Sequence, residues 1–187
     1  MNEADAWTAV KKALKPKRFE HTERVVLEAE RLQLRYGGDA ERIRLAAVIH
    51  DYGKYRPAEE MRETIRQTPS LPDDLAGYGE ELLHAFAGAV YLKKELGITD
   101  PTVLDAVTYH TTGRAGMTVE EKIVFLADYI EPGRTFQEAD KVRAAAESSL
   151  DKACFLALKY TILFLAGRSE LIYPYTFEAY NDLQRKL

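Results

Sequence analysis

The stretch Ala-Ala-Val-Ile-His-Asp-Tyr-Gly-Lys, residues 46–54, decides the fold and the chemistry of this chain. Its apolar residues recur with helical spacing behind Asp39, a residue type that favours the N-cap of a helix. Gly53 then ends the segment, because glycine readily adopts the backbone conformations that terminate helices. The stretch therefore predicts a buried helix whose end carries two metal-ligating side chains, His50 and Asp51.

Helical periodicity continues on both sides of this stretch. Between residues 56 and 78, however, the prolines and Gly77 predict a short helix followed by a mobile surface loop. Alternation of apolar and polar residues never persists, so no strand is expected. The chain is predicted to be a single all-α domain over residues 1–187, with a motif-bearing core at about 17–131 and C-terminal helices at 135–187 packed on it. The expected helices cover residues 3–14, 18–36, 39–53, 80–96, 100–112, 118–131, 138–150, 151–165 and 174–183.

The composition narrows the classes of function. The chain of 187 residues has 26 Lys and Arg against 30 Asp and Glu, and the resulting net charge of −4 provides no positive field for nucleic acid. No apolar stretch approaches the roughly 20 residues of a membrane span, and Met1–Lys17 lacks the apolar segment of a signal peptide. The one cysteine, Cys154, lies in an apolar run that predicts a buried side chain rather than a nucleophile. We expect a cytoplasmic protein without nucleic-acid or membrane partners. Residues 155–165 are expected to be core, and a homodimer interface is the alternative.

All four histidines fall on the core-facing side or at the end of an expected helix: His21, His50, His84 and His110. A single histidine in such a place is more often a hydrogen-bonded core residue than a ligand. Because all four share this placement, a common ligand site is favoured.

Two carboxylates extend the pattern. Asp51 follows the apolar stretch 45–49, and Asp128 interrupts the apolar run 123–130. A buried carboxylate must be paired or bound to metal, so the alternative for Asp128 is a salt bridge to an arginine. Imidazole and carboxylate ligands suit iron, manganese, zinc or nickel, and the absence of thiolates disfavours an iron–sulfur cluster. Six such ligands exceed what one cation with an open position needs, and they suit two cations that share a hydroxide.

Cations and hydroxyls lie close to each ligand in the sequence, as a polyphosphate substrate would require. Lys54 and Arg114 are the first candidates, because lysine supplies a compact charge and arginine a bidentate fork for phosphate oxygens. Lys54 is also a candidate catalytic group, beside Asp51, that would stabilise the leaving phosphate. For Arg18 and Arg134, exposed charges on a solvated face are an equal alternative. The full set of candidate substrate-binding residues is Arg18, Lys54, Thr111, Thr112, Arg114 and Arg134.

The proline-rich segment 56–78 is a candidate lid over a bound nucleotide. Tyr78 or Phe86 would then stack on a base, although aromatic residues at helical spacing more often belong to the core.

Together these residues resemble a known family. His21 in Arg-Phe-Glu-His-Thr, His50-Asp51 in Val-Ile-His-Asp-Tyr-Gly-Lys, and Asp128 in Leu-Ala-Asp-Tyr-Ile-Glu-Pro are similar to the H…HD…D signature of the HD-domain metal-dependent phosphohydrolases. The segments around His84 and His110, and the C-terminal Tyr-Pro-x-Thr-x-x-x-Tyr-Asn, resemble the YqeK branch of that family. The resemblance runs from about residue 17 to 181.

The resemblance implies an all-helical HD fold, a two-iron centre and symmetrical hydrolysis of diadenosine tetraphosphate to two ADP. It implies that His21, His50, Asp51 and Asp128 hold one metal, and that Asp51 bridges to a second metal held by His84 and His110. Manganese, zinc, nickel or magnesium are alternatives to iron. The alternative functions are an HD-superfamily nucleotidase or dNTP phosphohydrolase, or a non-catalytic nucleotide-binding module.

Overall fold

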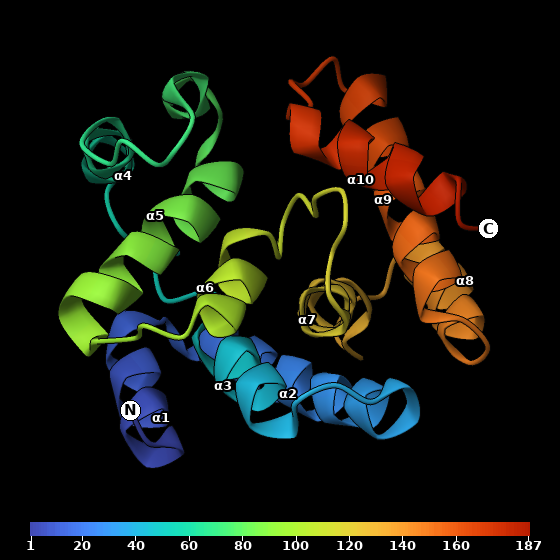
Figure 1. Cartoon of the computed structure of the whole chain (residues 1–187), viewed down its shortest axis with the longest axis horizontal. Coiled ribbons are helices and arrows are strands. Elements are labelled where there is room, and N and C mark those ends of the chain that lie inside the picture. The colour runs from blue at the N-terminus through green and yellow to red at the C-terminus, as the bar shows by residue number, and fades with distance from the viewer.

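The computed structural model describes all residues from 1 to 187 and contains helices without a strand (Figure 1), which confirms the all-α prediction. The elements are α1 (Glu3–Ala13), α2 (Pro16–Tyr36), α3 (Ala40–Ile49), α4 (Ala58–Arg66), the 3₁₀ helix η1 (Asp73–Gly77), α5 (Glu80–Leu96), α6 (Pro101–Thr108), α7 (Val119–Ile130), α8 (Gln137–Ala146), α9 (Leu150–Gly167) and α10 (Pro174–Gln184).

Several helices start where the sequence predicts an N-cap. The side chains of Asp39, Asp100 and Thr118 accept hydrogen bonds from the backbone N–H groups of the first turns of α3, α6 and α7. The predicted start of α2 at Arg18 is wrong by two residues, because Pro16 occupies the first turn of this helix, where its missing N–H costs nothing.

Two helices that carry site residues end earlier than predicted. α3 ends at Ile49, and tight turns follow in which the N–H of Lys54 donates to the carbonyl of Asp51 over 2.8 Å. α6 ends at Thr108 rather than near residue 112, so His110 lies in a turn. In both places the predicted metal ligands lie just beyond the helix, where side chains one position apart can converge.

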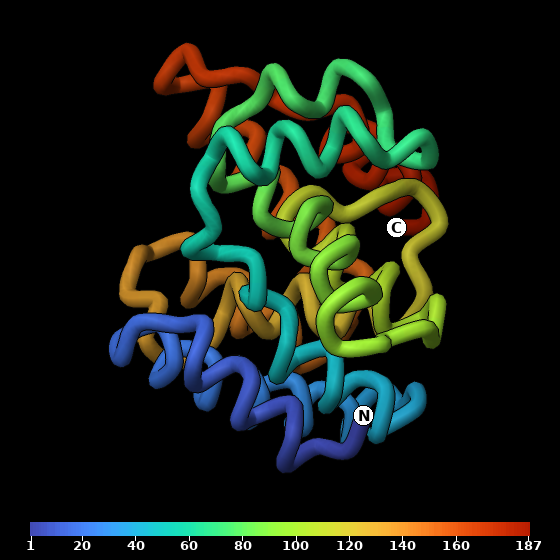
Figure 2. Tube along the Cα trace, turned by 90° about the vertical axis from the view of Figure 1, so that its left-hand side faces the viewer, coloured from blue at the N-terminus to red at the C-terminus, as the bar shows by residue number.

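The fold has two apolar clusters. The larger contains 33 buried residues and joins α1, α2, α3, α6, α7 and the C-terminal helices. The smaller contains nine, contributed by α4, η1, α5 and Tyr173. Figure 1 shows α4 and α5 on one side of α6 and α7, with α8, α9 and α10 on the other and α1 to α3 at the base. Figure 2 shows the same base of N-terminal helices below α4, η1 and α5.

The segment 56–78 is more ordered than the sequence predicts. Met61 and Leu75 are fully buried in the smaller cluster, so α4 and η1 pack on α5 instead of forming a loose surface loop. The sequence pattern missed this packing, because the prolines mark the start of α4 and of η1 rather than an irregular chain.

The turn after α3 lies directly against α5. A Cβ atom added to Gly53 would lie 2.7 Å from the carbonyl oxygen of His84 and 3.0 Å from Cα of Gly88. Only glycine allows the two backbones to approach this closely. This contact sets the position of α5, and therefore of His84, relative to Asp51.

The long helix α9 has two different halves. The buried residues of α9 lie in its first half and include Cys154. Burial raises the pKa of the Cys154 thiol. Leu163 and Phe164 in its second half are 57% and 61% exposed, so the prediction that residues 155–165 are core is right only for the first part. None of the helices is both long enough and apolar enough to cross a membrane.

Candidate metal centre

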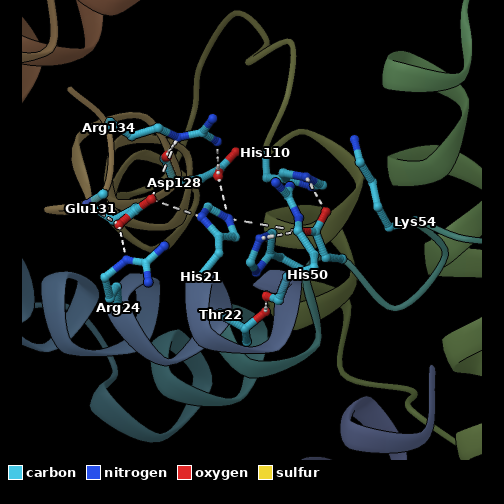
Figure 3. A network of polar contacts seen from close by, with 12 residues as sticks. His21, Thr22, Arg24, His50, Lys54, His110, Asp128, Glu131 and Arg134 are labelled. Atoms are coloured by element: carbon cyan, nitrogen blue, oxygen red, sulfur yellow. Dashed lines mark hydrogen bonds and ion pairs between the residues drawn. The ribbon is translucent and has the colours of Figure 1, made fainter. Parts of the chain in front are cut away.

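The six predicted metal ligands meet at one place in the fold. They come from α2, the turn after α3, α5, the turn after α6, and α7, and Figure 3 shows several of them pointing toward one another. Five of them are at most 5% exposed, and only Asp128 is less completely buried. Their ligand atoms form three overlapping groups: His21–His50–Asp51, His50–His110–Asp128 and Asp51–His84–His110.

Asp51 lies at the centre of the cluster. Its Oδ2 is 3.1 Å from Nε2 of His50, and its Oδ1 is 3.1 Å from Nε2 of His84. Nε2 of His21 is 3.0 Å from Oδ1 of Asp128. Nε2 of His110 lies 3.2 Å from Nε2 of His84. Each of the four imidazoles therefore turns the same nitrogen, Nε2, toward the carboxylates or toward another ring.

The other ring nitrogen, Nδ1, identifies the tautomer of three histidines. In each case it lies within hydrogen-bond distance of a backbone carbonyl, which can only accept, so Nδ1 carries a proton and Nε2 is the nitrogen available to a metal. The pairs are His50 with Ala47 (2.7 Å), His84 with Glu80 (3.2 Å) and His110 with Val107 (2.6 Å).

This donor set fits metal ions. Nε2 of His84 and Nε2 of His110 face each other, and Nε2 of His50 and Nε2 of His84 face Asp51, so a cation between these atoms would satisfy all of them together. Three buried ligand atoms lack any hydrogen-bond partner: Nε2 of His21, Nε2 of His50 and Oδ1 of Asp51. Imidazole nitrogen and carboxylate oxygen together suit a divalent transition metal.

The electrostatics of the cluster keep its carboxylates ionised. Burial alone would raise the pKa of Asp51, but the facing rings of His50 and His84 hold it well below the ordinary value. Burial likewise opposes ionisation of Asp128, yet His21 and Arg134 hold its pKa well below the usual range.

The histidines respond differently to the same surroundings. Burial, together with the neighbouring rings of His50 and His84, lowers the pKa of His110 to about 3. Burial also disfavours the charged form of His50, but the adjacent Asp51 outweighs it and raises the pKa of His50. His110 is therefore neutral at ordinary pH, as a histidine that binds a metal must be.

Glu131 belongs to the site and was not among the predicted residues. Its Oε1 lies 3.0 Å from Nδ1 of His21, and its Oε2 accepts a hydrogen bond from Nε of Arg24 over 2.6 Å (Figure 3). Burial by itself would raise the pKa of Glu131, but the hydrogen bonds from Arg24 and His21 outweigh this effect, and the pKa of Glu131 is lowered. The available signal was an acidic residue three positions after Asp128, just beyond the end of α7.

A cavity of about 630 Å³ opens beside the cluster. His110 and Asp128 line it together with Thr111 and Thr112, two of the predicted substrate-binding residues. The hydroxyl of Thr111 is buried without a hydrogen-bond partner. Tyr78, Leu82, Phe125, Tyr129 and Leu171 supply apolar and aromatic surface to the same cavity.

Three of the predicted cations lie at this site. Arg18 pairs with Asp51, and Arg134 donates to Oδ1 of Asp128 over 2.8 Å. Lys54 stands apart from the histidines in Figure 3 and donates to Glu81, over 2.6 Å, at the rim of the cavity.

Two other candidates lie elsewhere. Arg114 donates from Nε and Nη2 to the two carboxylate oxygens of buried Glu121, each over 2.7 Å. Its guanidinium also lies over the ring of Tyr109. Phe86 is 1% exposed in the smaller cluster, so the expectation that it stacks on a base is wrong. Tyr78, the other residue expected to stack on a base, lines the cavity.

Comparison with known proteins identifies the family of this chain. The HD domain family model matches residues 18–133. The symmetrical bis(5'-nucleosyl)-tetraphosphatase of Bacillus subtilis strain 168 is 42% identical over 183 residues, covering 98% of both chains. The enzyme of the same name from Halalkalibacterium halodurans is 46% identical over 183 residues, covering 98% of this chain and 97% of its own.

A solved structure shares the whole fold. The crystal structure of a predicted HD superfamily hydrolase involved in NAD metabolism, from Clostridium acetobutylicum, superposes with a TM-score of 0.93 at 36% identity. The match covers 100% of this chain and 99% of the other. With its four histidines and two aspartates gathered in one cluster, the chain belongs to the HD domain family and, within it, to the YqeK-type branch.

Proposed function

We propose that this protein is a metal-dependent hydrolase that cleaves diadenosine tetraphosphate symmetrically into two ADP. The observation that carries the proposal is the buried His–Asp cluster, which opens on a cavity in a chain that matches symmetrical bis(5'-nucleosyl)-tetraphosphatases over nearly its full length. In this reaction the oxygen of water forms a bond to one inner phosphorus, and the bridging oxygen leaves with the other ADP.

The proposed centre holds two cations. His21, His50, Asp51 and Asp128 would hold one, and Asp51, His84 and His110 the other, with Asp51 shared. Two divalent cations would supply charge neutralisation for the phosphates and would lower the pKa of water. Iron is our first assignment, with manganese, zinc, nickel or magnesium as alternatives, because nitrogen and oxygen donors accept all of them to differing degrees.

The residues around the cluster fit roles in binding the polyphosphate. Arg18 and Arg134 lie beside Asp51 and Asp128, so their guanidinium groups can contact phosphate oxygens that reach the cluster. The free hydroxyl of Thr111 is a donor without a partner at the cavity wall, and Thr112 lies next to it. Arg114 supports the site less directly, by anchoring the turn after α6 to Glu121.

Lys54 is proposed to stabilise the leaving ADP. Its ammonium group is held by Glu81, a residue of the cavity rim whose side chain is 89% exposed and therefore free to release it. Once released, the ammonium group would neutralise charge that develops on the departing phosphate.

Product analysis tests the proposal. The protein, loaded with iron or manganese, is incubated with diadenosine tetraphosphate, and products are separated by anion-exchange chromatography. ADP as the sole product is expected, and a chelator should abolish its formation. AMP with ATP, or no reaction by fully loaded protein, would contradict the proposal.

A substrate panel tests the alternatives. Release of phosphate from mononucleotides, or turnover of dNTPs or NAD in place of the dinucleotide, would favour another HD-superfamily hydrolase. Tight nucleotide binding without turnover would identify a binding module. Light scattering of the same sample determines whether the protein is a homodimer, for which the exposed Leu163 and Phe164 are the candidate interface.

We also propose that the protein acts in the cytoplasm. The single buried cysteine, Cys154, is compatible with a reducing compartment.

A further inference from the structure

The four histidines obtain the hydrogen bond that orients their rings in two different ways. Three of them donate from Nδ1 to a carbonyl three or four residues earlier in the chain. His50 and His110 lie just past the end of a helix, where backbone carbonyls lack partners within the helix, and His84 lies in the second turn of α5.

His21 has no such local acceptor. It lies inside the 21-residue helix α2, and the carbonyl of Arg18, three residues earlier, accepts a hydrogen bond from the hydroxyl of Thr22. Its Nδ1 instead faces Oε1 of Glu131, a residue 110 positions away in the sequence. This is the one ring whose orientation depends on another side chain.

Glu131 is held firmly for this contact. Its side chain is 3% exposed, and its Oε2 accepts hydrogen bonds from Nε of Arg24 over 2.6 Å and from the N–H of Gly133 over 2.5 Å. Gly133 leaves the room that the three groups need, because a Cβ atom there would lie 2.7 Å from Nη2 of Arg24 and 2.9 Å from Oε1 of Glu131.

Arg143 of α8 fixes the backbone of the same turn. Its guanidinium donates to the carbonyls of Ile130, Glu131 and Arg134 over 2.8, 2.8 and 2.6 Å. Ile130 is the last residue of α7, and Glu131 and Arg134 lie beyond it, where no further turn of this helix follows. The Glu131 carboxylate is thereby placed by the backbone as well as by its own hydrogen bonds.

We infer that Glu131 is a positioning residue of the metal centre, which holds His21 in the tautomer with Nδ1 protonated and Nε2 directed at Asp51 and Asp128. The inference rests on the proposed metal centre. An ionised carboxylate is a stronger acceptor than a carbonyl, and it makes the ligating nitrogen of His21 more basic. Partners of this kind typically contribute about 10- to 100-fold to metal affinity.

The first experiment measures the tautomer without metal. Long-range ¹H–¹⁵N NMR of the chelated protein should show a proton on Nδ1 of His21, the nitrogen that faces Glu131. In Glu131→Ala the ring should become a mixture of tautomers, while His50 retains its own through the Ala47 carbonyl. An unchanged His21 tautomer in Glu131→Ala would overturn the inference.

The second experiment measures metal affinity. Titration with Mn²⁺ alone, followed by EPR, should give a 10- to 100-fold weaker dissociation constant for one equivalent in Glu131→Ala. Glu131→Gln, whose amide oxygen can still accept from Nδ1, should recover part of that loss. Gly133→Ala should weaken the same equivalent by displacing Arg24 and Glu131.

Glu147→Gln is the matched control. Glu147 also pairs with arginines of α2, Arg31 and Arg35, but its side chain is 55% exposed and it contacts none of the metal-ligating residues. This variant should bind Mn²⁺ like the unmodified protein.

The outcomes separate the inference from the proposed function. Equal Mn²⁺ affinity in Glu131→Ala and the unmodified protein, even with a lower melting temperature, would reduce Glu131 to a structural role and overturn the inference. Failure of the unmodified protein to bind any Mn²⁺ would contradict the metal centre itself, and the NMR result would still decide whether Glu131 sets the tautomer. Normal Mn²⁺ binding without hydrolysis would contradict only the proposed function.

Discussion

The two ends of the His–Asp cluster are built on different parts of the fold. The end with His21, His50 and Asp128 is carried by α2, α3 and α7, whose buried side chains belong to the 33-residue core. The end with His84 relies on α5, much of whose apolar surface belongs to the separate nine-residue cluster with α4 and η1. Asp51 lies between the two ends and contacts both.

This difference teaches how the two proposed metal positions depend on packing. The first is formed by helices that already pack on one another to make the main core. The second exists only while α5 stays against the turn after α3, where Gly53 and Gly88 meet backbone to backbone. The second position is therefore the easier one to disturb without unfolding the protein.

Removing Asp51 should have the largest effect, because this residue is common to both ends. Asp51→Ala is expected to lose at least about 10³-fold in kcat/KM with diadenosine tetraphosphate, and to lose both metal equivalents. Kinetics and elemental analysis of the purified variant check this, with circular dichroism to establish that the helices remain. Turnover within tenfold of the unmodified protein would show that the cluster is not the reaction site.

Removing His84 should separate the two ends. His84→Ala is expected to keep the metal at the His21 end and lose the other, because no ligand of the first position comes from α5. The value of kcat/KM should fall by more than about 100-fold, which is a larger loss than that usually caused by removing a residue that only orients a metal ligand. Elemental analysis gives the remaining equivalents. A variant with neither metal would mean that the two positions form only together.

Adding a methyl group at Gly53 should act on the same end without touching a ligand. The new Cβ would meet backbone atoms of α5, so the helix must move, at a cost of about 1–3 kcal/mol in the free energy of unfolding. Denaturant unfolding and metal analysis of Gly53→Ala should show lower stability and selective weakening of the second metal.

Gly77→Ala is the matched control for that change. Gly77 lies next to the same helix, in η1, but a Cβ there meets nothing within 4 Å. Similar losses in both variants would contradict the account, because no contact at Gly77 could cause them.

A change of pH should give the smallest effect. The pKa of His110 is about 3 in the folded protein and about 6.5 when unfolded, so between these values the unfolded chain takes up a proton that the folded one does not. The contribution of this residue to stability is complete above pH 6.5 and falls as the pH drops toward 3, by about 2 kcal/mol between pH 7.5 and 5.

Urea unfolding of the chelated protein at these two pH values measures this contribution. His110→Gln should lose less stability on acidification than the unmodified protein, because it no longer carries this group. An equal loss in both proteins would contradict the assignment of the neutral form to buried His110.

Local features of the chain were predictable from the sequence. The caps at Asp39, Asp100 and Thr118 depend on hydrogen bonds within three residues, and residue type alone indicates them. The packing of Leu75 depends on α5 and Tyr173, and no neighbour in the sequence reveals it.

The same distinction applies to the site. The spacing of the histidines along helices predicted a common cluster, and the structure brings all four together. Arg114 was favoured as a phosphate ligand from its residue type, but its pairing with Glu121 depends on how the turn after α6 meets α7. The contact of Glu131 with His21 spans 110 residues, and it follows only from the way α2 and α7 pack.

Anomalous diffraction from crystals of the metal-loaded protein tests the central claim most directly. Data collected at the absorption edge of the bound metal should show two peaks on either side of Asp51, one among His21, His50 and Asp128 and the other beside His84 and His110. No peak in this cluster, in protein that elemental analysis shows to contain metal, would contradict the account.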